Sequence, residues 1–340
     1  MSSLDRILPF LRPIEDLLRD PAITELMVND GGRRVFVERN GGLELLADRT
    51  LEGRNLTVAI KNIARACGDE ISEAQPILDA RLEDGSRVAA MFPPCAVAGP
   101  ALTIRKFGRR YTLDDLVKNK TLSPVLAQRL IAAIRAEQNV LISGGTGTGK
   151  TTLLNALAAH IPDGNRIVVI EETAEIHLDK PNLLRFEARR AQIPLGHETP
   201  LPAVTIADLV RATLRHRPDR IIVGEVRGAE AFDLLQALNT GHAGSMCTIH
   251  ANRCVDALRR LETLALLGGV NLPIAAVRAQ IASAIDVVVF VVRGRDGRRS
   301  VTEIAEVASF GDRGGVRVAA RFTRREHGPL HQAVDEGVAS

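Results

Sequence analysis

The chain has 340 residues, enough for one to three domains, and its 45% hydrophobic and 25% charged residues are typical of a globular protein. Aromatic residues make up only 3%, which disfavours a platform that stacks single-stranded nucleic acid, and the net charge is only +3. None of the four cysteines belongs to a C-x-x-C pair, which disfavours a zinc site and a disulfide framework.

The first third of the chain has the pattern of a small α+β domain. Apolar residues recur at helical spacing within 4–18, and strand-like runs separated by glycine turns follow up to residue 47. A second helical pattern occupies 55–66, and two further stretches with strand character, 77–94 and 101–107, complete the region. We therefore predict an N-terminal domain over 1–107.

The order of strand and helix patterns changes after this domain. Residues 108–124 are expected to be a linker that turns helical, and from 125 to 308 apolar strands alternate with helices. Such alternation is typical of a parallel sheet with helices on both faces. The segment 309–340 is rich in glycine and arginine and is expected to be a mobile tail.

A phosphate-binding motif, G-x-x-x-x-G-K-T, lies between an apolar strand and a helical pattern, which is the context that its mechanism requires. Its glycines let backbone N–H groups converge on phosphate oxygens, and the helix N-terminus favours anions. Lys150 is expected to reach the β and γ phosphates, and the Thr151 hydroxyl to ligate Mg²⁺. The predicted nucleotide-binding residues are Gly144, Gly145, Thr146, Gly147, Thr148, Gly149, Lys150, Thr151 and Thr152.

Carboxylates end two of the apolar strands. Glu171 and Glu172 follow one strand, and Glu225 follows another after Gly224. In a parallel sheet these ends meet at one edge, so the acids are expected beside the phosphate loop, where hydrolysis needs groups for water and for Mg²⁺. The stretch 241–252 adds His242 and His250, which we expect in the same neighbourhood; their spacing does not favour a metal site.

Taken in order, these pieces resemble the hexameric secretion ATPases, which serve type IV secretion, conjugative transfer, type II secretion, type IV pili and tight-adherence pili. The matching stretches are ISGGTGTGKTTLLNAL as Walker A, VVIEETAEI as the acidic box, RPDRIIVGEVRG as Walker B and GHAGSMCTIHAN as the histidine box. DGSRVAAMFPP and GPALTIRKF match the family's N-terminal domain, and the resemblance spans about residues 20 to 307.

The resemblance implies a RecA-like P-loop ATPase domain of α/β class behind a smaller, PAS-like α+β domain, with six subunits in a ring. It implies ATP and Mg²⁺ as ligands, and inner-membrane platform proteins as partners, with the secreted substrate or pilin handled indirectly. No direct sequence-specific binding of nucleic acid is expected. The ring would lie in the cytoplasm against the inner membrane; the most apolar run, 281–292, is too short to span a bilayer and contains Asp286.

Individual roles follow from the same resemblance. Glu225 matches the glutamate that acts on water, Glu171 an acid of the Mg²⁺–water shell, and His250 a γ-phosphate contact. Arg87 and Arg105 resemble arginines that approach the γ-phosphate. Gly224 stands at a position that is ordinarily small in this family. The pair Glu171-Glu172 departs from the commoner Glu-Asp, so the role of the second acid is open.

Other functions compete with this interpretation. A DNA-translocating ATPase would show DNA-stimulated hydrolysis, a small-molecule kinase would need an acceptor pocket and a lid, and a nucleotide-binding scaffold would not turn over. Within the family, the compact length favours the secretion and conjugation branch, whereas the core sequence closely resembles the tight-adherence branch. Both branches stay open.

Overall fold

The computed structural model describes residues 11–39, 41–82, 85–106, 111–189, 191, 201–269, 271–294, 296–310, 316–324 and 330–333. The chain divides into two compact units. One comprises Met1–Arg109 with Ala191–Pro202, and the other comprises Arg110–Arg190 with Ala203–Ser340. No helix in the described ranges is both long and apolar enough to cross a membrane.

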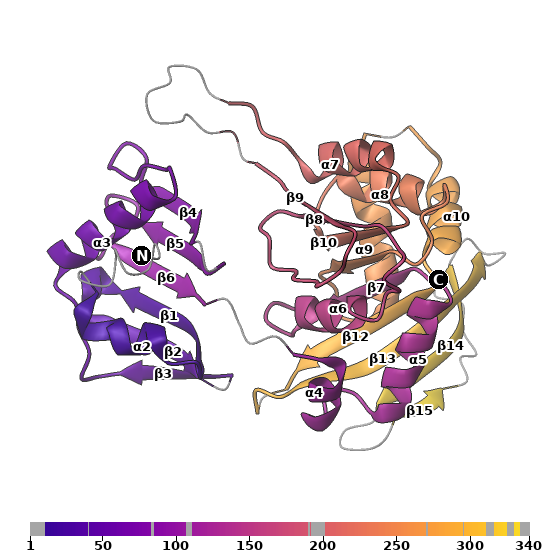
Figure 1. Cartoon of the computed structure of the whole chain (residues 1–340), viewed down its shortest axis with the longest axis horizontal. Helices are drawn as coiled ribbons and strands as arrows, with labels where there is room; N and C mark the ends of the chain where they lie inside the picture. The colour runs from indigo at the N-terminus through magenta and orange to yellow at the C-terminus, as the bar shows by residue number, and fades with distance from the viewer. Residues whose placement is uncertain are drawn as a thin grey trace. The chain divides into compact units, whose positions relative to one another are not determined.

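The first unit is built on a six-stranded antiparallel sheet with strand order β3-β2-β1-β6-β5-β4. Alternate residues such as Leu26, Val28 and Ile104 are buried, and helices α2 and α3 pack their apolar side chains against that face (Figure 1). The elements are α2 (Glu15–Arg19), β1 (Ile23–Asn29), β2 (Arg34–Arg39), β3 (Gly42–Leu46), α3 (Gly53–Ala66), β4 (Ile77–Arg81), β5 (Arg87–Met91) and β6 (Ala101–Arg105).

The second unit contains a nine-stranded sheet with order β15-β14-β13-β12-β7-β11-β10-β8-β9. The six strands from β12 to β9 in this order pair in parallel, and β13 to β15 continue the sheet antiparallel. The strands are β7 (Val140–Gly144), β8 (Ile167–Glu171), β9 (Leu183–Glu187), β10 (Arg220–Val226), β11 (Met246–Ile249), β12 (Val287–Arg293), β13 (Arg299–Phe310), β14 (Val316–Arg324) and β15 (Leu330–Ala333).

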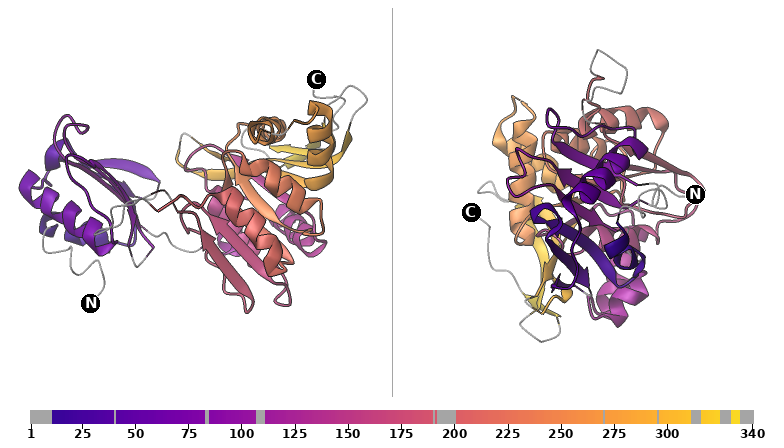
Figure 2. Two further views of the ribbon diagram at one scale, coloured as in Figure 1. Left: turned by 90° about the horizontal axis from the view of Figure 1, so that it is seen from above. Right: turned by 90° about the vertical axis from the view of Figure 1, so that its left-hand side faces the viewer.

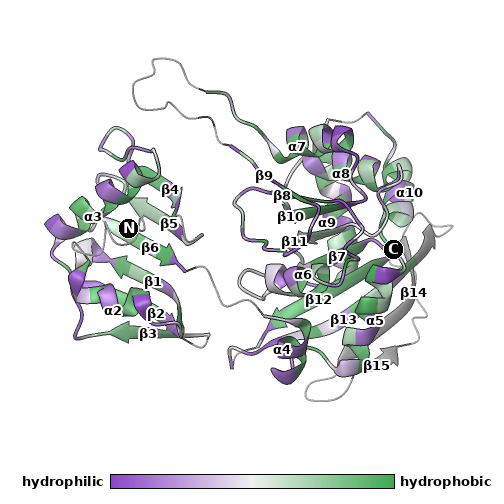
Figure 3. Cartoon of the chain, viewed as in Figure 1, coloured by the Kyte–Doolittle hydropathy of each residue, from purple (hydrophilic) through white to green (hydrophobic). Residues whose placement is uncertain are grey.

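Helices cover both faces of this sheet (Figure 1; Figure 2). On one face, α4, α5 and α6 pack with one set of strand residues, and on the other, α7 to α10 pack with the alternate set. This two-sided burial explains the continuous hydrophobic strands seen in Figure 3, such as β7 and β12. The helices are α4 (Leu113–Lys118), α5 (Pro124–Arg135), α6 (Lys150–Ala158), α7 (Ile206–Thr213), α8 (Glu230–Leu238), α9 (Cys254–Leu267) and α10 (Ile274–Ala284).

One segment follows the sequence expectation and another differs from it. The helix expected within 108–124 is α4, which begins at a capping box formed by Thr112 and Asp115, and its Leu113 and Leu116 are buried in the core of the second unit. Within the expected tail, β14 and β15 extend the sheet by antiparallel pairing. Glycine and arginine content concealed these strands, because the pairing of β14 depends on β13 and not on its local composition.

Candidate active site

The phosphate-binding loop follows β7 and leads into α6, as the motif requires. A side chain at Gly144 would place its Cβ 2.4 Å from the carbonyl oxygen of Val291, so only glycine fits there. Gly149 has a φ of +93° and forms the N-cap of α6, a conformation that glycine adopts without strain. Thr151 and Thr152 lie in the first turn of α6 behind Lys150.

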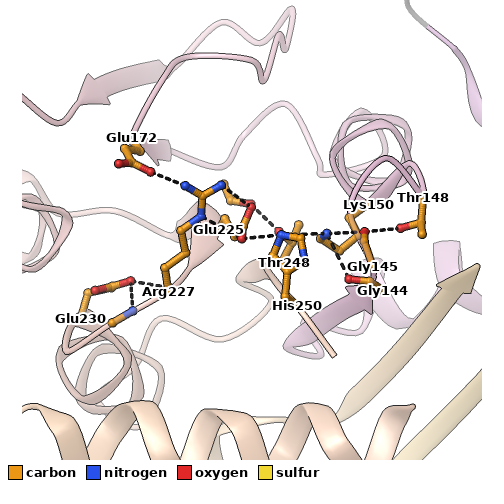
Figure 4. Close-up of polar contacts among 12 residues, drawn as sticks. Gly144, Gly145, Thr148, Lys150, Glu172, Glu225, Arg227, Glu230, Thr248 and His250 are labelled. Atoms are coloured by element: carbon orange, nitrogen blue, oxygen red, sulfur yellow. Dashed lines mark hydrogen bonds and ion pairs between the residues drawn. The ribbon is translucent and has the colours of Figure 1, made fainter. Parts of the chain in front are cut away.

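The Lys150 side chain is buried and lies along this loop. Its Nζ donates to the carbonyl oxygens of Gly144 at 3.2 Å and Gly145 at 2.9 Å, and the Thr148 hydroxyl also donates to the Gly145 carbonyl at 3.0 Å (Figure 4). The ammonium is therefore solvated by the loop's own oxygens. Arg299 of β13, which the sequence reasoning missed, donates from Nε to the Gly147 carbonyl at 3.0 Å.

At the end of β8 the two adjacent acids have different surroundings. Glu171 is buried, and its Oε1 accepts hydrogen bonds from the backbone N–H groups of Glu175 at 2.8 Å and Ile176 at 2.9 Å. Burial raises the pKa of Glu171 to about 7 even though these N–H groups lower it. Glu172 points to the neighbouring strand end, where its Oε2 lies 2.6 Å from Nη1 of Arg227.

Gly224, one residue before Glu225, makes room for Glu171. Val223 of β10 pairs with Ile170 of β8, so the next residues of the two strands lie side by side. A Cβ on Gly224 would lie 3.0 Å from Cγ of Glu171 and 3.4 Å from its Oε1. The glycine therefore lets a carboxylate from β8 occupy the space beside β10.

Glu225, near the end of β10, lies among charged side chains. Its Oε2 accepts a hydrogen bond from Nη2 of Arg227 at 3.1 Å, and its Oε1 lies 2.9 Å from Nε of the same guanidinium. Oε1 also lies 2.8 Å from Nε2 of His250. Although both nitrogens are close, no donor among the described residues is aligned on Oε1, which is a buried atom. One oxygen of Glu225 is therefore held by charge and left without a directed hydrogen bond.

His250 connects Glu225 to the phosphate loop. Its Nε2 lies 3.5 Å from Nζ of Lys150, so Lys150, His250, Glu225, Arg227 and Glu172 form one continuous row (Figure 4). Burial and the neighbouring charge of Lys150 lower the pKa of His250 below its usual value, against the opposing effect of Glu225. The imidazole is therefore neutral near pH 7.

The structure separates the two histidines that were expected together. His242 precedes β11 and His250 follows it, so they lie at opposite ends of this strand. Nδ1 of His242 lies 2.9 Å from the carbonyl oxygen of Ala237, at the end of α8. The expectation of a shared neighbourhood was wrong because a strand of four residues, at about 3.3 Å a residue, keeps its two flanks more than 10 Å apart.

Arg87 and Arg105 lie in the first unit, where they are direct cross-strand neighbours on β5 and β6. Arg81 of β4 pairs with Arg87, and Glu25 of β1 pairs with Arg105, so the register brings these charges into one row across four strands. Nη2 of Arg87 lies 3.9 Å from Oδ1 of Asp79. The two arginines predicted from sequence thus share one face of the antiparallel sheet.

A pocket of about 300 Å³ opens beside the row and is lined by Glu225, Val226, Arg227, His250 and Arg260. Arg260 belongs to α9 and had no signal in the motifs, whereas Arg227 stands inside the RIIVGEVRG stretch and could have been singled out there. No group of three or more His, Cys, Asp or Glu side chains able to hold a metal occurs in the described part of the chain.

Comparisons with known proteins agree with this geometry. The family model described as "Type II/IV secretion system protein" matches residues 11–325. The conjugal transfer protein TrbB of Rhizobium radiobacter is 38% identical over 299 residues, which cover 86% of each chain. The type IV secretion system protein VirB11 of Brucella suis biovar 1 is 35% identical over 326 residues, which cover 86% of this chain and 88% of that protein.

A solved structure supports the fold. The Legionella pneumophila ATPase DotB superposes with a TM-score of 0.59 at 23% identity, covering 90% of this chain and 82% of that one. A parallel sheet with a phosphate-binding loop and carboxylates at two adjacent strand ends defines a P-loop ATPase. The chain belongs to the type II/IV secretion system protein family, and it is an ATP-hydrolysing enzyme.

Proposed function

We propose that this ATPase drives type IV secretion or conjugative transfer, in the manner that the names of its relatives indicate. The position of Glu225 is the observation that supports the ATP hydrolysis on which this transport depends. This acid lies near the end of a parallel strand, connects through His250 to Lys150 of the phosphate loop, and has a buried oxygen on which no described donor is aligned. Such an oxygen can accept a proton from an attacking water or orient it.

The remaining members of the row take roles that fit their contacts. The residues 144–152 hold the phosphates of ATP, and Lys150 exchanges the carbonyl oxygens of Gly144 and Gly145 for the β and γ phosphates. His250, a neutral imidazole between Lys150 and Glu225, contacts the γ-phosphate and responds to its loss. Glu225 acts on water.

Mg²⁺ is the metal that the donor set fits. It prefers oxygen ligands, keeps several waters, and uses one or two protein groups beside the phosphates, so no cluster of three acids is needed. The Thr151 hydroxyl would bind it directly and Glu171 through water, with Oε2 of Glu171 free of the two backbone N–H bonds that Oε1 accepts. When bound, the ion neutralises charge on the phosphates.

The proposal extends to the first unit and to the assembly. Arg87 and Arg105, which neighbour each other across β5 and β6, supply positive charge to the γ-phosphate from the N-terminal domain. Guanidinium groups suit this task because they stay charged and bind phosphate oxygens with two N–H groups. Six subunits form a homohexameric ring at the cytoplasmic face of the inner membrane, docked on platform proteins.

Lys150→Ala tests the phosphate-loop assignment. The variant loses the only side-chain ammonium of the loop 144–151. We expect a fall of at least about 10³-fold in ATP hydrolysis, since a charge at the γ-phosphate is lost in a low-dielectric site. Phosphate release is the measurement, and Lys180→Ala, whose ammonium binds Ile161 and Asp163, is the control. Undiminished turnover in Lys150→Ala would remove the assignment.

The ring is tested by light scattering of the full chain with and without a non-hydrolysable ATP analogue. A mass of six protomers in the presence of the analogue supports the proposed assembly. A strict monomer at every concentration contradicts it. Hydrolysis that is stimulated by DNA, with a steep dependence on salt, would instead favour the DNA-translocating alternative.

A further inference from the structure

Arg227 joins the ends of two parallel strands. Its Nε and Nη2 contact the two carboxylate oxygens of Glu225 at 2.9 and 3.1 Å, and its Nη1 reaches Oε2 of Glu172 at 2.6 Å. The guanidinium therefore makes one directed hydrogen bond and one close ion-pair contact to the acid of β10, and it has one further bond to the acid that follows β8. Figure 4 shows Arg227 between these two carboxylates. Two contacts from one planar guanidinium restrict the orientation of the carboxylate as well as neutralise its charge.

The backbone that carries Arg227 is fixed too. The backbone N–H groups of Arg227 and Gly228 both donate to Oε1 of Glu230, at 2.6 and 2.8 Å, at the start of α8. The guanidinium thus extends from a turn whose backbone is bound to the start of α8. By contrast, Glu225 itself has no described donor aligned on Oε1, so Arg227 supplies the directed bond that the carboxylate has on its other oxygen.

We propose that Arg227 is a positioning residue that sets the orientation of the Glu225 carboxylate, and that Glu172 acts on the reaction by holding Arg227. This inference rests on the proposed role of Glu225 in hydrolysis. It gives the second acid of the Glu171-Glu172 pair a task of its own. Glu171 accepts hydrogen bonds from the loop that follows it and has its proposed role at Mg²⁺. Glu172 instead acts on the attacking water indirectly, by holding Arg227.

An ordinary surface ion pair would not have these consequences, and the chain contains a matched example. Arg211 has a side-chain exposure of 56%, close to the 57% of Arg227, and it also binds two acids, Asp208 and Asp233. Those acids are not at a strand end beside the phosphate loop. Because exposed ion pairs add little to folding stability, loss of either arginine should leave the fold intact, and only Arg227 should affect catalysis.

The first experiment compares ATP hydrolysis by Arg227→Ala, Arg227→Lys and Arg211→Ala. We expect Arg227→Ala to lower kcat about 10- to 100-fold with KM nearly unchanged, because a misplaced catalytic group costs rate more than substrate binding. Arg227→Lys keeps the charge without the planar guanidinium that contacts both acids and should be intermediate, and Arg211→Ala should match the wild type. Added methylguanidinium should restore part of the rate of Arg227→Ala and none of that of Glu225→Gln.

The second experiment is a double-mutant cycle with Glu225→Gln, measured with radiolabelled ATP so that slow turnover is detected. If Arg227 works through Glu225, Arg227→Ala should cost little further rate in the Glu225→Gln background. An equal cost in both backgrounds, or a kcat for Arg227→Ala within about twofold of the wild type, would overturn the inference. Wild-type turnover by Glu225→Gln would overturn the proposed role of Glu225 as well, so the two failures are distinguishable.

Glu172→Gln tests the last link. It keeps the shape of the side chain and removes the charge that holds Nη1 of Arg227. We expect kcat to fall about 2- to 5-fold, the scale of one exposed charge-assisted contact, and no further fall when the change is added to Arg227→Ala. A fall of the same factor in the Arg227→Ala background would show that Glu172 does not act through Arg227.

Discussion

The ends of β8 and β10 carry carboxylates at the same edge of the sheet, but different groups hold them. At β8, backbone N–H groups of residues 175 and 176 bind Glu171, which is buried. At β10, the groups that contact Glu225 are the side chains of Arg227 and His250. Backbone donors fix an acid whatever ligand is present, whereas side chains can rearrange when nucleotide binds. Glu171 is therefore a fixed part of the structure, whereas Glu225 is placed to take part in the reaction.

The largest expected effect on ATP hydrolysis comes from removing the charge of Glu225. We expect Glu225→Gln to bind ATP with nearly wild-type affinity and to lower kcat by about 10³-fold, within the range for loss of a general base. A fluorescent ATP analogue measures binding, and phosphate release measures turnover. Glu15→Gln, at a partly exposed acid of the first unit that pairs with Arg19, is the control. Equal turnover by the wild type and Glu225→Gln would place the reactive group elsewhere.

Glu171, the acid at the end of β8, should make the stability of the protein depend on pH. The pKa of Glu171 is raised from 4.5 to about 7, so the protonated acid favours the folded state; its contribution is complete below pH 4.5 and is lost as the pH rises through 7. At about 1.4 kcal/mol per pKa unit, the metal-free protein should lose about 3 kcal/mol of unfolding free energy across this window. Glu171→Gln should lack this loss.

Chemical denaturation of the nucleotide-free protein in EDTA, at pH values from 4.5 to 8, measures this effect. The comparison between the wild type and Glu171→Gln cancels the contribution of all other titrating groups. Parallel stability curves for the two proteins would contradict the assigned pKa.

The smallest effect concerns the space between the two strand ends. Gly224→Ala would place a Cβ 3.0 Å from Cγ of Glu171, and we expect it to lower the unfolding free energy by about 1–2 kcal/mol. Gly164→Ala, at an exposed position with nothing within 4 Å of the added Cβ, should change stability by less. Urea denaturation measures both. If the cost arises from Glu171, it should shrink in a Glu171→Ala background; an unchanged cost would exclude this cause.

Much of the fold could be predicted from the sequence because the relevant signals are local. The apolar run before Gly144 and the helical pattern after Lys150 predict the loop between strand and helix, and the alternation of strands and helices predicts the parallel sheet. The sequence did not predict strands β14 and β15, because their position depends on pairing with β13 and with each other, which composition does not encode.

The sequence predicted some members of the candidate site but few of their contacts. The motifs bring Lys150, Glu225 and His250 together, as the row of contacts shows. Adjacent residues at a strand end point to different sides, so the sequence alone could not tell which of Glu171 and Glu172 turns inward. Arg227 was missed because its importance comes from reaching two acids that lie 55 and 2 residues away in sequence.

Because Gly224 has no side chain, substitutions at this position directly affect the carboxylate of Glu171. One backbone position cannot both carry a carboxylate and leave room for the carboxylate of its neighbour, because Cγ of Glu171 already lies 3.0 Å from where a Cβ would be. Gly224→Asp would therefore not add an acid to this site but would displace the one from β8. The two positions are coupled: an acid can move from one strand to the other only if both residues change together.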